Sequence, residues 1–122
     1  MGKSELKTEI RALYQKANNE TLEDLIDGIC GALERNADAI ADVTYSYRIC
    51  ASDTGFTRAF SVKQGKLTEM SEIDEADVTV TGTEANLLAV FRRQVSPMSA
   101  MLRGKIKIKG SMPALVRFAE FL

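Results

Sequence analysis

The sequence has no histidine and no tryptophan, and only two cysteines among its 122 residues. Without histidine, the chain lacks the commonest general base, the Ser-His and Cys-His nucleophile pairs and the commonest zinc ligand. The cysteines, Cys30 and Cys50, form no CxxC pair and no metal-ligand spacing. Two such isolated thiols fit a protein of the reduced cytosol. We therefore expect no catalytic residues, no metal site and no cofactor.

Long apolar runs are also missing, since no stretch approaches the roughly 20 apolar residues of a membrane-spanning helix. Charged residues begin at Lys3 and Glu5, and the N-terminus has no apolar region of a secretory signal. The 16 basic and 17 acidic residues nearly cancel, so overall charge gives no reason to bind nucleic acid. These features predict a cytoplasmic protein without a nucleic-acid partner.

The acidic residues show no recognisable ligand pattern. The cluster at 69–77 lacks the glycine and the ligand spacing of a calcium loop, and no phosphate-binding glycine motif occurs. We interpret the acidic cluster as a solvated connector.

Apolar spacing predicts helices in the first third of the chain. Leu6, Ile10 and Leu13 recur at helical spacing after Ser4, and this first helix is expected to continue through Ala17. Thr21 is a candidate N-cap for a second helix, with an apolar face from Leu22 to Leu33.

Alternation of period two begins at Val43. It predicts strands over 43–50, 56–62 and 66–70, separated by turns at 52–55 and 64–65. Such short turns require antiparallel neighbours, because a parallel crossover needs about a dozen residues or more.

In the last third of the chain, apolar residues recur with strand spacing and helix spacing in turn. A strand around Val78 and Val80 leads to Thr83, the candidate cap of a helix with its apolar face running to Val95. Ser96 and Pro97 then predict a second helix start. A strand over 105–109 and a final helix from Ser111 to Leu122 complete the chain.

The element order predicts an α+β fold, and the 45% hydrophobic content suits one domain spanning 1–122. Asp77-Val78-Thr79-Val80, Ser96-Pro97-Met98 and the strand from Gly104 to Gly110 together resemble the C-terminal half of the sterol carrier protein two (nonspecific lipid-transfer) family. The resemblance implies a single domain with a five-stranded, mainly antiparallel sheet. It also implies helices packed on one sheet face and an apolar tunnel between the layers.

The C-terminal helices carry soft and bulky apolar residues. On spacing alone these stripes are typical of buried core, whereas the resemblance assigns them to a lipid-binding wall. The candidate lipid-binding residues are Leu87, Leu88, Phe91, Met98, Met101, Leu102, Met112, Leu115 and Phe118.

Basic residues in the same third are candidates for contact with lipid headgroups or an anionic membrane surface. They are Arg92, Arg93, Arg103, Lys105, Lys107 and Lys109. A solvated face, or lysines that protect a sheet edge, is the competing interpretation.

We therefore expect a noncatalytic domain that binds and transfers fatty acids, fatty acyl-CoA, sterols or other apolar ligands, as a monomer or a homodimer. The alternative is an accessory or dimerisation domain that has a collapsed cavity and acts through a protein partner. A phosphate-reading nucleic-acid module is a third interpretation, which the lack of aromatic residues among the basic ones disfavours.

Overall fold

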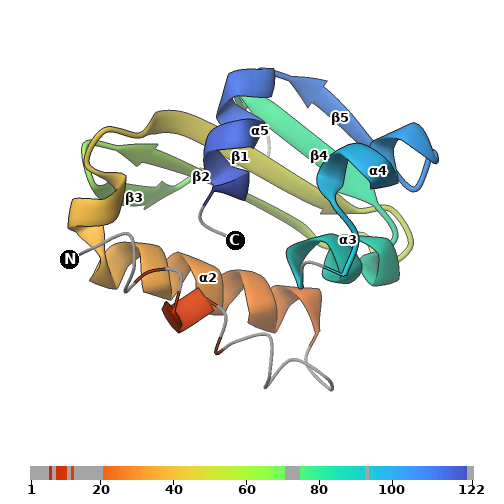
Figure 1. The fold of residues 1–122 in the computed structure, drawn as a ribbon, viewed down its shortest axis with the longest axis horizontal. Helices are drawn as coiled ribbons and strands as arrows, with labels where there is room; N and C mark the ends of the chain where they lie inside the picture. The colour runs from red at the N-terminus through yellow and green to blue at the C-terminus, as the bar shows by residue number, and fades with distance from the viewer. Residues whose placement is uncertain are drawn as a thin grey trace.

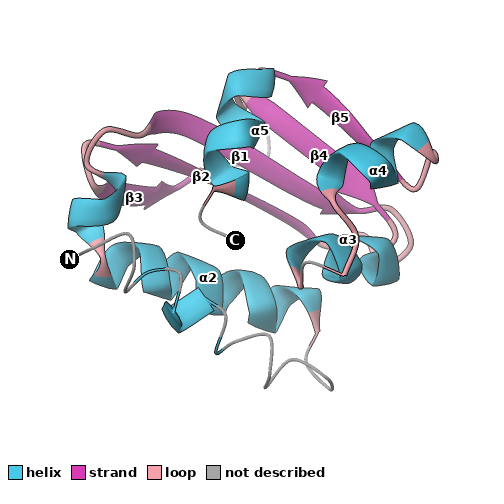
Figure 2. Cartoon of the chain, viewed as in Figure 1, coloured by secondary structure: helices cyan, strands magenta, loops and turns pink. Residues whose placement is uncertain are grey.

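The computed structural model describes residues 6, 8–10, 12, 21–70, 75–92 and 94–120. Helices cover one face of a five-stranded sheet in this part of the chain (Figures 1 and 2). The elements are α2 (Leu22–Arg35), the 3₁₀ turn η2 (Ala37–Ile40), β1 (Thr44–Ala51), β2 (Thr57–Lys63), β3 (Lys66–Glu69), β4 (Val78–Gly82), α3 (Glu84–Phe91), α4 (Pro97–Leu102), β5 (Ile106–Gly110) and α5 (Met112–Ala119).

Only part of the predicted first helix can be compared with the structure. Residues 6, 8–10 and 12 are helical, and Leu6 and Ile10 are fully buried. The remaining predicted positions, 13–17, lie outside the described residues, as do Arg93 and Leu122.

The strand order is β3-β2-β1-β4-β5. Three neighbouring pairs are antiparallel, and only β1 and β4, in the middle of the sheet, are parallel. The predicted α+β class with a five-stranded, mainly antiparallel sheet is confirmed.

The helix starts follow the predicted capping residues. Thr21, Thr83, Ser96 and Ser111 each accept a hydrogen bond from the backbone N–H three residues later, at 3.1–3.2 Å. Each cap satisfies an N–H that the first helical turn would otherwise leave without a partner.

α3 ends at Phe91, although its predicted apolar face ran to Val95. Ser96 precedes a proline and is extended, with ψ 148°, because proline disfavours helical geometry in the residue before it. The chain between the helices forms a wider turn instead, in which the backbone N–H groups of Gln94 and Val95 both donate to the carbonyl of Ala89, five and six residues earlier. The short turn η2 was not predicted.

The core lies between the sheet and the helices. Alternate residues of β1 point to the helix side, where Tyr47, Ile49 and Ala51 are buried. α2 runs along this side and buries the apolar face that the sequence predicted. Arg58 also points to this side, where its guanidinium pairs with Asp27 of α2 and Glu69 of β3.

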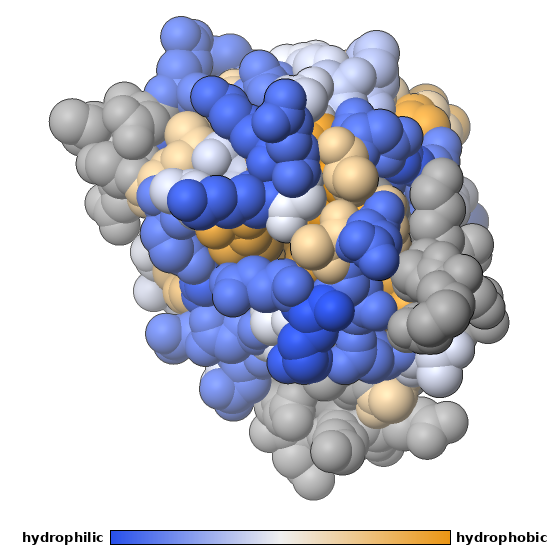
Figure 3. Space-filling view, turned by 90° about the vertical axis from the view of Figure 1, so that its left-hand side faces the viewer, coloured by the Kyte–Doolittle hydropathy of each residue, from blue (hydrophilic) through white to orange (hydrophobic). Residues whose placement is uncertain are grey.

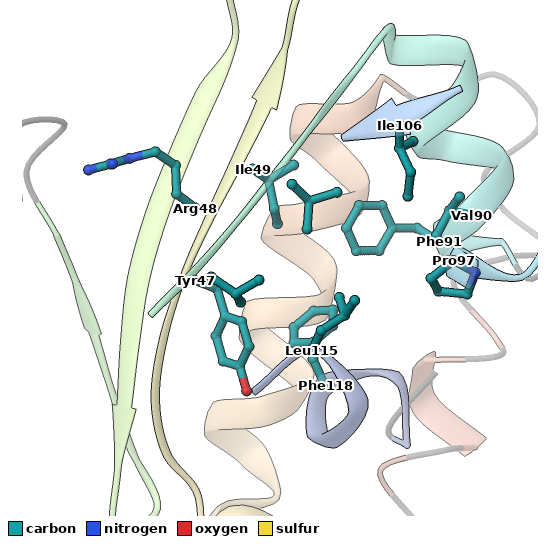
Figure 4. A pocket seen from close by; sticks show the side chains of 11 residues that line it. Tyr47, Arg48, Ile49, Val90, Phe91, Pro97, Ile106, Leu115 and Phe118 are labelled. Atoms are coloured by element: carbon teal, nitrogen blue, oxygen red, sulfur yellow. The ribbon is translucent and has the colours of Figure 1, made fainter. Parts of the chain in front are cut away.

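The opposite sheet face has no helix over it in the described structure (Figure 1). The strands turn Thr, Ser, Lys and Arg side chains to this face, including Arg48, which points away from the helices in Figure 4. The end of the molecule shown in Figure 3 is mostly hydrophilic, with hydrophobic residues visible in gaps between polar ones. None of the helices in the described ranges is long and apolar enough to cross a membrane.

Candidate functional site

An apolar cavity lies between the centre of the sheet and the helices that follow it in sequence (Figure 4). Its volume is about 30 Å³. The lining side chains come from β1, β4, β5, α3, α4 and α5, and they are Tyr47, Ile49, Val78, Val80, Val90, Phe91, Pro97, Ile106, Leu115 and Phe118. Arg48 also borders the cavity, but its side chain points to the other face of the sheet.

Strand pairing explains why these side chains meet. Tyr47 lies opposite Val78, and Ile49 lies opposite Val80, so the two central strands present one continuous apolar strip to the helices. Gly82 lies opposite Ile106, and this register turns Ile106 to the same side at the edge of the strip.

Aromatic rings form one end of the lining. The ring of Phe118, on α5, has its centroid 4.9 Å from that of Tyr47 and 6.0 Å from that of Phe91, which it meets edge to face. These separations fall in the favourable range for aromatic pairs. α5 is therefore joined both to the sheet and to α3 through one ring.

Tyr47 supplies a polar atom to this apolar lining, and that atom already has a partner. Its hydroxyl donates to the Ala114 carbonyl in α5, at 3.1 Å. Burial raises the pKa of Tyr47 above its ordinary value, so the phenol stays neutral at physiological pH. The lining side chains therefore carry no charge toward the cavity.

The described residues include no group of three or more His, Cys, Asp or Glu side chains placed to hold a metal ion. The cavity can enclose an apolar group, but its lining includes no acid, base or nucleophile arranged for chemistry.

The nine predicted lipid-binding residues fall into three groups. Phe91, Leu115 and Phe118 line the cavity. Leu87 is fully buried, while Leu88 and Met101 are partly buried and pack against the core. The exposed group consists of Met98, Leu102 and Met112.

Most of the cavity wall was missed at the sequence level, because the prediction considered only the apolar stripes of the helices, and Val90 and Pro97 were missed even there. Five lining residues are inward-facing strand positions, Tyr47, Ile49, Val78, Val80 and Ile106. Their period-two alternation was visible in the sequence, and it could have identified the strand faces turned toward the helices.

The predicted basic residues do not share one face. Lys107 and Lys109 pair with Thr81 and Thr79 and lie on the sheet face opposite the cavity. Arg103 and Lys105 are exposed where α4 leads into β5, and Arg92 is partly buried at the C-terminal end of α3.

The fold and cavity define the chain as a small α+β domain that has helices on one sheet face and an uncharged apolar interior site. Residues 22–122 match the model of the SCP-2 sterol transfer family. The chain belongs to this family, as the resemblance in its C-terminal third indicated.

Individual relatives are distant. Sterol carrier protein 2 of Rattus norvegicus is 39% identical over 57 residues, which cover 46% of this chain and 10% of that protein. The human hydroxysteroid dehydrogenase-like protein 2 is 23% identical over 119 residues, covering 97% of this chain and 28% of that protein. The chain therefore spans a minor part of these curated relatives.

Solved structures share the fold at low identity. The palmitated SCP2L2 protein of Aedes aegypti matches with a TM-score of 0.61 and 20% identity, covering 83% of this chain and 93% of that one. The sec-alkylsulfatase Pisa1 from Pseudomonas sp. matches with a TM-score of 0.70 and 22% identity, covering 82% of this chain and 16% of that one. The fold thus occurs both alone and as a small part of a larger enzyme.

Proposed function

We propose that this chain binds a lipid noncatalytically, with an apolar chain of the lipid held between the sheet and α3, α4 and α5. The observation that carries the proposal is the apolar, uncharged lining of the cavity, in which the Tyr47 hydroxyl is already bonded to Ala114. Burial of a methylene chain contributes about 0.8 kcal/mol per CH₂ without any hydrogen-bonding partner. Family membership supports lipid transfer as the wider role.

A fatty acyl chain is the ligand class that we favour. The Aedes aegypti protein of the same fold was solved in palmitated form. A flexible chain can also follow a narrow gap between side chains, whereas the rigid rings of a sterol require a wide one. Fatty acids are therefore the first ligands to test, ahead of sterols.

Loading requires the cavity to expand. A cavity of about 30 Å³ is far below the roughly 300–1,000 Å³ of typical ligand sites. We propose that the helix wall moves away from the sheet, and that α5 is its movable part, because Leu115 and Phe118 provide much of that wall.

The small volume also favours a second candidate function. An accessory or dimerisation domain with a collapsed cavity would act through a protein partner and retain no lipid. A native mass spectrum of the protein purified from cells separates the two functions. A lipid-sized adduct supports the carrier, and a dimer without an adduct supports the partner domain.

The direct test fills the cavity. Leu115→Trp places a larger side chain in the lining, whereas Met101→Trp places the same side chain at a partly buried position outside it. Uptake of a fluorescent fatty acid should fall in Leu115→Trp and persist in Met101→Trp. Overpacking costs each variant about 1–3 kcal/mol, so circular dichroism must show that both are folded. Equal uptake by the two folded variants would refute binding in this cavity.

One domain spanning 1–122 completes the proposal. The described buried apolar residues from Leu6 to Phe118, Ala59 excepted, belong to one hydrophobic cluster, and this continuity supports a single folding unit.

A further inference from the structure

The large apolar side chains exposed among the described residues all lie on two helices. On α4, Met98 and Leu102 are 49% and 79% exposed, and on α5, Met112 and Val116 are 38% and 54% exposed. Each pair is spaced i, i+4, so its members lie on one side of their helix. Most globular surfaces scatter such residues singly, whereas here they form two pairs on the helices that precede and follow β5 in the sequence.

Both helices cover the same face of the sheet (Figure 1). Ala100 of α4 and Ala114 and Phe118 of α5 are buried on the inner side. The exposed pairs therefore point away from the sheet. The same two helices contribute Pro97 and Leu115 to the cavity, so the exposed apolar pairs stand on the outer side of the cavity wall.

Acidic residues are absent from the stretch of sequence that contains both helices. Residues 85–119 contain no Asp or Glu, and the 17 acidic residues of the chain all lie outside this segment. Seven basic residues lie within it, namely Arg92, Arg93, Arg103, Lys105, Lys107, Lys109 and Arg117. The net charge of −1 thus conceals a basic stretch of sequence. Not all of its cations are near the exposed pairs, because Lys107 and Lys109 lie on the opposite sheet face and Arg117 is paired with Asp42 and Glu120.

Two of these cations adjoin the most exposed apolar residue. Arg103 and Lys105 follow Leu102 in the turn between α4 and β5, and both are exposed. An exposed leucine beside exposed cations is the combination that inserts into a lipid surface while contacting its phosphates.

We propose that the α4–α5 surface, made of Met98, Leu102, Met112 and Val116 with Arg103 and Lys105, docks on a bilayer that contains anionic phospholipid. This inference rests on the proposed function, because docking turns the cavity wall toward the membrane and lets an acyl chain pass without crossing water. A second copy of the chain is a poorer occupant. In a two-fold dimer the same patch would meet itself and bring like charges together.

The first experiment tests the apolar contact. Sedimentation with vesicles of phosphatidylcholine containing about 30% phosphatidylserine measures the partition of the protein. Leu102→Gln with Val116→Gln alters two exposed positions, so the fold should persist. We expect the partition coefficient of this double variant to be roughly tenfold lower than that of the wild type, because two apolar side chains no longer enter the bilayer.

The second experiment uses matched charge reversals. Arg103→Glu with Lys105→Glu changes the net charge by the same amount as Lys63→Glu with Lys66→Glu. Lys63 and Lys66 are exposed and paired with each other on β2 and β3, away from α4 and α5. Loss of the two cations alone should lower partition roughly thirtyfold, and the two carboxylates that replace them should lower it further, whereas the Lys63 and Lys66 reversal should lower it only a few-fold. Equal losses would overturn the proposal, since net charge alone would then account for binding.

Two further outcomes bear on the occupant. If the wild type is a dimer that Leu102→Gln with Val116→Gln makes monomeric, and neither protein sediments with vesicles, a second copy covers the surface and membrane docking is wrong. Fatty acid uptake in vesicle-free solution is measured in parallel. Uptake without vesicle association overturns docking and leaves the proposed function standing, whereas association without uptake supports docking and removes the cavity function.

Discussion

Gly110 ends β5 at a place where no side chain fits. Its φ is +114°, and a Cβ atom there would overlap the Asp77 carbonyl oxygen and stand 3.0 Å from the Val78 Cα. The same carbonyl accepts a hydrogen bond from the Ser111 backbone N–H at 2.7 Å, which fixes the start of α5. Glycine at this position therefore lets β5, β4 and α5 meet.

The change Gly110→Ala should lower the free energy of unfolding by about 3 kcal/mol or more, because conformational strain adds to overlap with the backbone. Gly104→Ala is the matched control, since Gly104 has φ +71° but no atom within 4 Å of the place that an added Cβ would take. It should lose only about 1–2 kcal/mol from strain. Urea denaturation measures both values, and equal losses would show that the close approach to Asp77 is unimportant.

At the scale of elements, polar contacts involve α5 at two places along its length, Ala114 and Arg117. The Ala114 carbonyl accepts from Tyr47 in the sheet, and Arg117 pairs with Asp42 and with Glu120 at 2.6 Å. These few contacts, with the ring of Phe118, fasten the helix that we propose to move on loading.

Tyr47→Phe should loosen α5 without emptying the core. Loss of one hydrogen bond should lower stability by about 1 kcal/mol, and the amides of 112–119 should exchange with solvent faster, while those of α2 change little. Hydrogen exchange with mass spectrometry gives this comparison. Tyr45→Phe, a hydroxyl removal on the same strand and sheet side, is the control. Uniform acceleration in α2 and α5 would contradict a local role for the Tyr47 hydroxyl.

Features that depend on residues close together in the sequence could be predicted, whereas those that depend on distant residues could not. The caps at Thr21, Thr83, Ser96 and Ser111 are local hydrogen bonds, and the sequence predicted all of them. The parallel neighbours β1 and β4 were not predicted as a pair, because β2 and β3 lie between them in the chain.

The candidate site was less predictable for the same reason. Phe91, Leu115 and Phe118 line the cavity, whereas Met98 and Leu102 have similar helical spacing and are exposed. Spacing shows which residues lie on one side of a helix. It does not show whether that side packs against the sheet or, as for Met98 and Leu102 of the short α4, is exposed to solvent.

For the whole molecule, one hydrophobic cluster extends from Leu6 to Phe118 and includes residues of the described helices and of the central strands. A domain with one continuous core should unfold in a single transition. Its enthalpy of unfolding should be about 85 kcal/mol, at about 0.7 kcal/mol per residue.

Calorimetry together with circular dichroism in the far and near ultraviolet tests this expectation. The two spectral melting curves should coincide, and the calorimetric and van't Hoff enthalpies should agree. Separate melting of the N-terminal helices and the C-terminal part would contradict a single domain over 1–122.

The parallel pairing of β1 with β4 also bears on the order of folding. The hairpins β1–β2 and β2–β3 join strands that are adjacent in the chain, whereas β4 must close a long loop to reach Tyr47 and Ile49. Contacts of such long range slow the search for the native state. During synthesis β1 can pair with β2, but it cannot pair with β4 until residues 78–82 have left the ribosome. The cavity therefore forms only when β4 joins β1.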